Sequence, residues 1–187
     1  NWQMSRMKPL SRTGSAGPTQ VEVAGAAAQV LAGFPFQLNF VIPPNTPAGP
    51  QTVQISSPYG SSAQTIEIRP VSPAIFLLSS GAPAAVNQNG ALNSPDAPAT
   101  RGQAITLYTT GLGVVQRRGN LDFATAAVEA TLEGRALTVQ FAGLAPGFPG
   151  LYQINLIIPA DTPPGLTQEL RLRVAESSAP PITVAVQ

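Results

Sequence analysis

The stretch QLNFVIPPNTPAG at residues 37–49 returns 116 positions later as QINLIIPADTPPG at residues 153–165. Over the fourteen residues that begin with each glutamine, seven are identical. Before the prolines of both copies every second residue is apolar, which is the pattern of a strand with one buried face. The repeat therefore predicts two copies of one β unit in a single chain.

The two copies are unequal in length. Their similarity extends upstream, where residues 21–33 parallel residues 130–143. The second copy has about 55 further residues ahead of this shared part, whereas the first has only 20, which are polar and alternate little. The first copy also omits the APGFPGLY loop of residues 145–152. We therefore expect an N-terminal tail or donor segment at 1–20, a partial module at 21–71 and a complete module at 72–187.

The distribution of proline and glycine favours short strands over helices. Twenty prolines and seventeen glycines are spread along 187 residues, and an interior proline breaks a helix. The LRLRVA stretch shows the strand phase most clearly, because Leu170, Leu172 and Val174 would face a core while Arg171 and Arg173 face water. Short segments of this kind at intervals of about ten residues predict an all-β sandwich.

Turn residues agree with this fold. Asn89-Gly90 is the signal of a two-residue hairpin in which both residues take positive φ. In the loops PPNTPAG and PADTPPG, Asn45 and Asp161 are placed where a side chain can accept a hydrogen bond from the backbone two residues on. The repeated loop is thus sufficiently explained as a turn.

Composition excludes several classes of function. Charged residues make up 10% of the chain and its net charge is +1, so the basic stripe that a nucleic-acid binder needs is missing. The sequence contains neither histidine nor cysteine, which removes the usual general base and thiol chemistry. The most apolar stretch, residues 23–36, is too short and too broken by glycine and proline to span a bilayer, and NWQMSRMKPLSRTG has no signal-peptide core.

Candidate chemistry is sparse. Nothing in the pattern brings two carboxylates together in one cleft, so a solvated role is favoured for all nine. The loop residues Asp96, Asp122 and Asp161 are the candidates for calcium ligands, although no D-x-D-x-D run is present. TTGLG at 109–113 lacks the third glycine and the helix of a phosphate loop and fits a tight turn or bulge. We expect no cofactor and no enzyme activity.

Two other kinds of residue are candidates for contacts. Tyr59, in the turn SSPYGSS, is the one aromatic residue that we would probe as a ligand contact, for example with glycans. Tyr108 and Tyr152 lie within strand-like segments and are expected to be structural. Asn39 and Asn155 occupy equivalent positions in the two copies, where an amide could satisfy backbone groups at a bulge or sheet edge.

Several motifs of the second copy occur in the order of a known module. SPAIF at 72–76, AVNQNGALNSPDAPATRGQAITLYTTGLG at 85–113, FAGLAPGFPGLYQINLIIP at 141–159 and the terminal ITVAVQ resemble the uncharacterised immunoglobulin-like C-terminal β domain that is repeated in large secreted proteins of acidobacterial type. The resemblance covers residues 72–187, and residues 21–71 resemble only the latter half of that domain. It implies immunoglobulin-like β-sandwiches in tandem, the first partial, and an extracellular or cell-surface location, and it assigns no site residue.

The incomplete first module suggests a role in assembly. A sandwich without its early strands leaves unpaired backbone groups and an uncovered core, which can accept a strand from elsewhere. The segment at residues 2–10 is the expected donor, acting in its own module or in a neighbour's, through Trp2, Met4, Met7 and Leu10. The first hypothesis is therefore a self-associating structural β protein, for example a fibre or surface-layer subunit. The alternatives are a spacer next to other domains of a larger secreted protein, or a module that binds carbohydrate or calcium.

Overall fold

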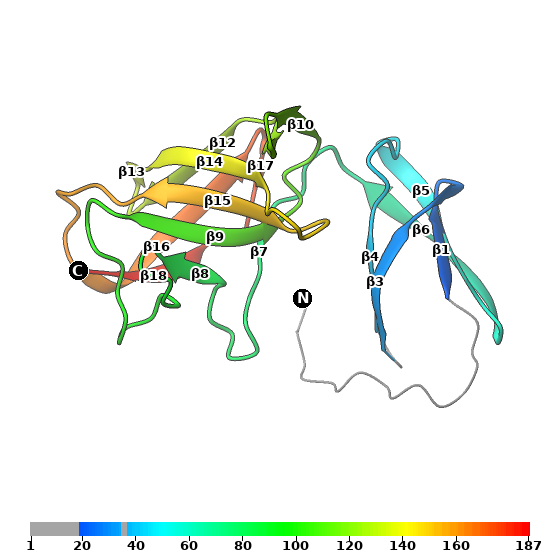
Figure 1. The fold of residues 1–187 in the computed structure, drawn as a ribbon, viewed down its shortest axis with the longest axis horizontal. Helices are drawn as coiled ribbons and strands as arrows, with labels where there is room; N and C mark the ends of the chain where they lie inside the picture. Colours follow the sequence, from blue (N-terminus) through cyan, green and yellow to red (C-terminus); the bar gives the residue numbers. More distant parts are fainter. Residues whose placement is uncertain (1–18, 35–36) are drawn as a thin grey trace. The chain divides into compact units, whose positions relative to one another are not determined.

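The computed structural model describes residues 19–34 and 37–187, and every regular element in these ranges is a β-strand (Figure 1). The described residues divide after Pro70 into two compact units, the second of which is Val71–Gln187. No helix that could cross a membrane occurs in the described ranges. The all-β class predicted from the sequence is confirmed.

The unit Val71–Gln187 consists of two sheets. The strands of the first sheet follow the order β10-β11-β14-β15-β9-β7, with β8 also paired to β9, and they are β7 (Ala74–Ile75), β8 (Ala85–Asn87), β9 (Ala104–Thr110), β10 (Val115–Arg118), β11 (Leu121–Ala124), β14 (Thr138–Leu144) and β15 (Tyr152–Ile157). The second follows the order β13-β12-β16-β17, with β18 also paired to β16, and its strands are β12 (Val128–Leu132), β13 (Arg135–Ala136), β16 (Gly165–Val174), β17 (Ser177–Ser178) and β18 (Ile182–Val186).

This strand order is that of an immunoglobulin-like sandwich. Strands β7 and β8, β9, β15 and β14 take the places of strands A, B, E and D, while β12, β16 and β18 take those of C, F and G. Ala99, which precedes β9, forms a parallel bridge with Val186 of the last strand. The first segment of the unit therefore contacts both sheets and closes the sandwich.

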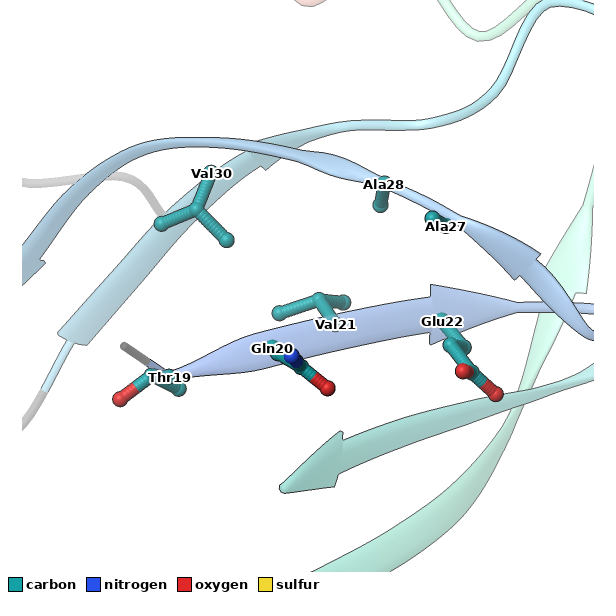
Figure 2. A pocket seen from close by; sticks show the side chains of 7 residues that line it. All are labelled: Thr19, Gln20, Val21, Glu22, Ala27, Ala28 and Val30. Carbon is teal, nitrogen blue, oxygen red and sulfur yellow. The ribbon is translucent and has the colours of Figure 1, made fainter. Parts of the chain in front are cut away.

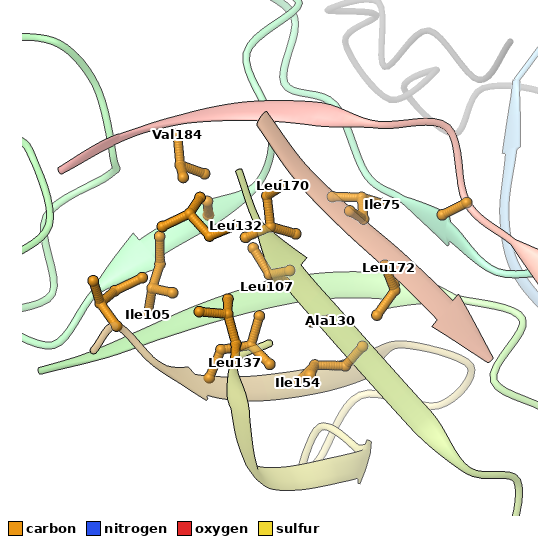
Figure 3. Packing of buried hydrophobic residues seen from close by; sticks show 14 of the residues in the cluster. Ile75, Ile105, Leu107, Ala130, Leu132, Leu137, Ile154, Leu170, Leu172 and Val184 are labelled. Atoms are coloured by element: carbon orange, nitrogen blue, oxygen red, sulfur yellow. The ribbon is translucent and has the colours of Figure 1, made fainter. Parts of the chain in front are cut away.

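The core lies between the two sheets of this unit (Figure 3). Leu107 of β9, Ile154 of β15 and Leu170 of β16 are among its fully buried side chains. Burial of each such side chain stabilises the fold by about 1.5–3 kcal/mol. In β16, Leu170, Leu172 and Val174 are buried and the arginines between them are exposed, as the alternation predicts.

The first unit contains fewer strands. Its sheets are β2-β1-β5-β6 and the pair β3-β4. The strands are β1 (Gln20–Val23), β2 (Ala26–Ala27), β3 (Gln29–Phe34), β4 (Gln37–Val41), β5 (Gly49–Ser57) and β6 (Gly60–Ile68). Its buried core is small and consists of Val21, Val23 and Val53.

Matching details show that the first unit repeats part of the second. β1 pairs with β5 as β12 pairs with β16. The register shift between Val30 and Ala32 in the β3-β4 pair recurs between Val139 and Phe141 in the β14-β15 pair. The first unit thus has counterparts of strands C to G, and the described residues contain no counterpart of strands A and B. Over the described residues the first sandwich is therefore partial.

The equivalent two-residue turns after β1 and β12 share an unusual backbone. Ala24 and Gly25 have φ of 52° and 77°, and Glu133 and Gly134 have φ of 47° and 78°. Positive φ at both central residues is the type I′ geometry, whose twist matches that of the flanking strands. Glycine at the second position relieves the strain of this conformation.

The expected two-residue hairpin at Asn89-Gly90 was wrong. Only Gly90 has positive φ, at 85°, and its N–H donates to the Asn87 carbonyl at 2.9 Å. The Asn87 N–H donates to the Ala91 carbonyl at 2.8 Å, and this bond closes the loop. The loop thus holds three residues, in the alternative geometry of a type I turn followed by one left-handed residue.

The expected role of Asn45 and Asp161 in the repeated loop was also wrong. Two residues on stand Pro47 and Pro163, which have no N–H to donate. The turns are instead closed by the backbone N–H of the intervening threonines, which donates to Pro43 in the first copy and to Pro159 in the second, at 3.1 Å in both. The Asp161 carboxylate binds Arg135.

Candidate functional site

The candidate site is the second edge of β4. In the complete unit the equivalent strand, β15, is hydrogen-bonded to β14 on one side and to β9 on the other. β4 pairs with β3 on one side, and no strand of the described ranges pairs with its other side. Backbone N–H and C=O groups along such an edge are a template for another strand.

The core-facing side chains of β4 are less buried than those of β15, which has a strand on each side. Ile154, Leu156 and Ile158 of the complete unit are all 0% exposed. Their counterparts Leu38 and Phe40 are only partly buried, and Ile42 is 37% exposed. The same pattern of apolar residues is therefore fully covered in one copy and incompletely covered in the other.

A hollow of about 390 Å³ lies beside this incomplete core, between β1 and the chain from Ala27 to Val30. Figure 2 shows the side chains of Val21 and Val30 pointing into the space between these strands, while those of Gln20 and Glu22 point away from it. Ala28 contributes only a methyl group here. In the complete unit its position is taken by Leu137, whose N–H makes the equivalent bond to Ala130 as Ala28 does to Val21.

The equivalent asparagines differ in their partners. Asn155 Oδ1 accepts hydrogen bonds from Gln153 Nε2 at 2.9 Å and from Thr106 Oγ1 of β9 at 3.0 Å. Asn39 Oδ1 accepts the equivalent bond from Gln37 Nε2 at 2.8 Å. These partners are side chains rather than the backbone groups expected from the sequence. Thr106 could not be identified as a partner from the sequence, because it lies 49 residues from Asn155.

The polarity of its edge distinguishes β4 from β6, an outer strand of the other sheet. β6 has the sequence GSSAQTIEI and is exposed over most of its length, so water can satisfy its edge. β4 has the sequence QLNFV and is half-buried throughout. It carries neither a charge nor a proline, the residues with which proteins protect a strand edge from pairing.

Tyr59 lies apart from this edge, in the turn between β5 and β6. Its side chain is 87% exposed, and its N–H donates to Ser57 Oγ at 3.2 Å. Among the described residues of the first unit it is the one exposed aromatic side chain, since the other large exposed apolar residues are Leu31 and Ile42. A single ring does not form the stacking surface expected of a glycan site.

The candidate calcium ligands are not brought together. Asp122 pairs with Arg117 at 3.0 Å, and Asp161 pairs with Arg135, whose hydrogen bond and positive charge lower the pKa of that carboxyl group. Asp96 is exposed in the turn from Ser94 to Ala97. Among the described residues no three acidic, histidine or cysteine side chains lie close enough together to hold a metal ion. The expected donor residues Trp2, Met4, Met7 and Leu10 lie outside the described residues.

The glycine motif TTGLG closes the turn after β9. Gly111 has φ of 76°, and a Cβ atom there would lie 1.9 Å from the carbonyl oxygen of Ser72. Ser72 N–H donates to the Gly111 carbonyl at 2.9 Å. Gly111 therefore allows the first residues of the complete unit to pack against its strand B, which is the structural interpretation of this motif.

Tyr152 has a structural role and provides a test of the packing around this turn. Its hydroxyl donates to the Gly113 carbonyl, and burial raises the pKa of the phenol above 10.0. The pKa of Tyr152 is thus higher in the folded state than in the unfolded state, where it is about 10. The contribution of the Tyr152 hydroxyl to the free energy of unfolding is therefore complete below about pH 10 and is lost as pH rises through the folded pKa. In a Tyr59→Phe, Tyr108→Phe variant Tyr152 is the one tyrosine left. The pH at the midpoint of its phenolate absorbance titration should be higher in the folded protein than in concentrated urea, and equal midpoints would contradict this packing.

Comparisons with known proteins place the chain in no family. No family model matches it, and no curated protein matches it. Among solved structures, the crystal structure of the I9-I11 tandem from titin is similar with 9% identity and a TM-score of 0.29, over 90% of this chain and 54% of the titin chain. The chain thus spans about half the length of that tandem. A TM-score this low assigns neither fold nor function, and the immunoglobulin-like description follows from the strand order.

Proposed function

We propose that this chain is a non-enzymatic structural β protein that assembles by strand complementation. The donor is the segment at residues 2–10 of a neighbouring copy, and the acceptor is the free edge of β4. The observation that carries this proposal is the contrast between Ile158, fully buried, and Ile42, 37% exposed. An added strand in the place of β9 would cover the first core as β9 covers the second.

The chemistry of the first unit suits this kind of contact. Of residues 19–70 only Glu22, Glu67 and Arg69 are charged, so few ions lose their hydration when a strand docks. Backbone bonds along β4 would supply affinity, and pockets for alternate side chains would supply specificity. In residues 2–10, Trp2 and Met4 are separated by one polar residue, the spacing of side chains on one face of a strand.

Donation from one copy to the next has a consequence for assembly. The donor and the acceptor are different parts of the chain, so the contact is head-to-tail, and it extends as an open array unless the rotation between copies closes a ring. Repetition of such a contact produces a filament or a layer. The resemblance of residues 72–187 to a repeated domain of secreted proteins supports an extracellular or cell-surface location for this assembly.

The test compares oligomeric state across protein concentrations, by light scattering and electron microscopy. We expect the full chain to form extended oligomers as concentration rises. Trp2→Ser with Met4→Ser removes both apolar side chains from the donor and should leave monomers. Ser5→Ala with Lys8→Ser changes two polar residues of the same segment that take no part in the proposed contact and should retain assembly.

Hydrogen exchange at the amides of β4 separates the remaining outcomes. Oligomers in which these amides are protected, and which the Trp2→Ser, Met4→Ser variant loses, support the proposal. Monomers at every concentration with rapidly exchanging β4 amides would overturn it. The proposal would also be overturned by full-length monomers whose β4 amides are protected and lose this protection when residues 1–18 are removed. In that case the segment at residues 2–10 would complete its own module.

A further inference from the structure

The complete unit contains a template for the strand that the first unit takes up. β9 runs antiparallel to β15 with Ile105 opposite Leu156, Thr106 opposite Asn155 and Leu107 opposite Ile154. Ile105 and Leu107 are 0% exposed in the core. Thr106, between them, points to the other face of the sheet and donates its hydroxyl hydrogen to Asn155.

The edge of β4 repeats the acceptor half of this arrangement. The shared register places Leu38, Asn39 and Phe40 where Ile154, Asn155 and Leu156 lie. Gln37 orients the Asn39 amide as Gln153 orients that of Asn155. Within the described ranges Asn39 Oδ1 accepts this one bond, and the second acceptor position corresponds to the one that Thr106 fills in the complete unit.

We propose that Asn39 selects the incoming strand, an inference that rests on the proposed function. The strand must run antiparallel to β4 and carry a side-chain hydrogen-bond donor opposite Asn39, between two apolar residues that cover Phe40 and Leu38. Asn39 is thus a specificity-determining residue of the edge. A strand with an aliphatic residue opposite Asn39 would leave a polar oxygen partly buried without its second partner.

The segment at residues 2–10 of a neighbouring copy can meet this requirement with its first three residues. Trp2 is then opposite Phe40, Gln3 opposite Asn39 and Met4 opposite Leu38. In this register the Gln3 amide would donate the hydrogen bond that the Thr106 hydroxyl donates in β9. A shift by one residue would turn Trp2 and Met4 away from the core and place an apolar side chain opposite Asn39.

Peptides derived from β9 test this requirement without depending on the native donor. The protein is the full chain with Trp2→Ser and Met4→Ser, which leaves the β4 edge free. The probe is QAITLYTT, residues 103–110, flanked by lysines for solubility and labelled for fluorescence anisotropy. Protection of β4 amides from exchange on addition of the peptide locates the binding site.

Replacement of the donor residue in the peptide should weaken binding. Thr106→Val keeps the shape of the side chain and removes the hydroxyl, so we expect about 3- to 10-fold weaker binding, the loss of one neutral hydrogen bond. Thr106→Ser should bind as the parent peptide does. Thr110→Val makes the same chemical change outside the paired register of β9 and β15 and should have no effect.

The outcomes separate this inference from the proposed function. Binding that Thr106→Val weakens and Thr110→Val does not supports both, and Asn39→Ala in the protein should abolish the difference in affinity between the parent peptide and its Thr106→Val variant. Equal binding of these two peptides with protection of β4 would overturn selection by Asn39 and leave strand addition intact. Absence of binding by every peptide would overturn strand addition itself.

Discussion

Ile158→Ala should lower the free energy of unfolding of the complete sandwich by about 2–4 kcal/mol, the usual cost of truncating a fully buried isoleucine. Ile42→Ala, the same change at the equivalent position of the first unit, should cost only about 1–2 kcal/mol, because a side chain that is already partly in water loses less on truncation. The exposed fractions of the two side chains are 0% and 37%. The pair tests directly whether the first core is incompletely covered.

Hydrogen exchange followed by mass spectrometry can measure both effects in the full chain, because peptides from each unit report on their own unit. The free energies should be compared in the Trp2→Ser, Met4→Ser background, where the proposed donor is absent. Equal costs at the two positions would mean that Ile42 is buried in solution as deeply as Ile158. That result would remove the main support for an open edge at β4.

The phase of individual strands could be predicted from the sequence because it is a local property. Leu170, Leu172 and Val174 are buried as predicted, since alternation along the length of β16 leaves one register that buries the apolar face. The repeat also predicted that the first module lacks strands, because an internal copy supplies the standard of comparison, and the described residues contain no counterpart of strands A and B. Both inferences needed only residues that are adjacent in the chain or aligned between copies.

Features that depend on distant residues were not predictable in this way. The hydroxyl partner of Asn155 comes from β9, and no property of Thr106 in the sequence distinguishes it from other threonines of a strand. The same is true of the Asp161 carboxylate, whose partner Arg135 lies 26 residues away. The prediction of a two-residue turn at Asn89-Gly90 was wrong for a related reason. The hydrogen bond between Asn87 and Ala91 sets the loop length, rather than the local preference of the two residues.

Asn93→Ala should destabilise the complete sandwich by about 3 kcal/mol or more, although it removes only a small polar side chain. Asn93 is 6% exposed. Its Oδ1 accepts from Ala185 N–H at 2.8 Å, and its Nδ2 donates to the Ala185 carbonyl at 2.8 Å and to Asn87 Oδ1 at 3.0 Å. Truncation leaves the buried Ala185 N–H of β18 without this acceptor and removes the hydrogen bond to Asn87 Oδ1.

The position of this network explains why its loss should affect the whole unit. Asn93 lies 92 residues from Ala185 and holds the segment before β9 against the last strand, next to the parallel bridge between Ala99 and Val186. Asn89→Ala is the matched control, since its Oδ1 accepts one exposed bond, from Ala91 N–H at 3.0 Å, and its loss should cost under about 1 kcal/mol.

Thermal unfolding distinguishes the two asparagine variants. For a unit of this size, 1 kcal/mol corresponds to a change in Tm of about 4 °C, so Asn93→Ala should lower the Tm by about 10 °C or more and Asn89→Ala by a few degrees at most. A similar small change in both would mean that Ala185 N–H finds another acceptor. The segment before β9 would then be held by its backbone bonds alone, and the polar contact across the sandwich would contribute little to its closure.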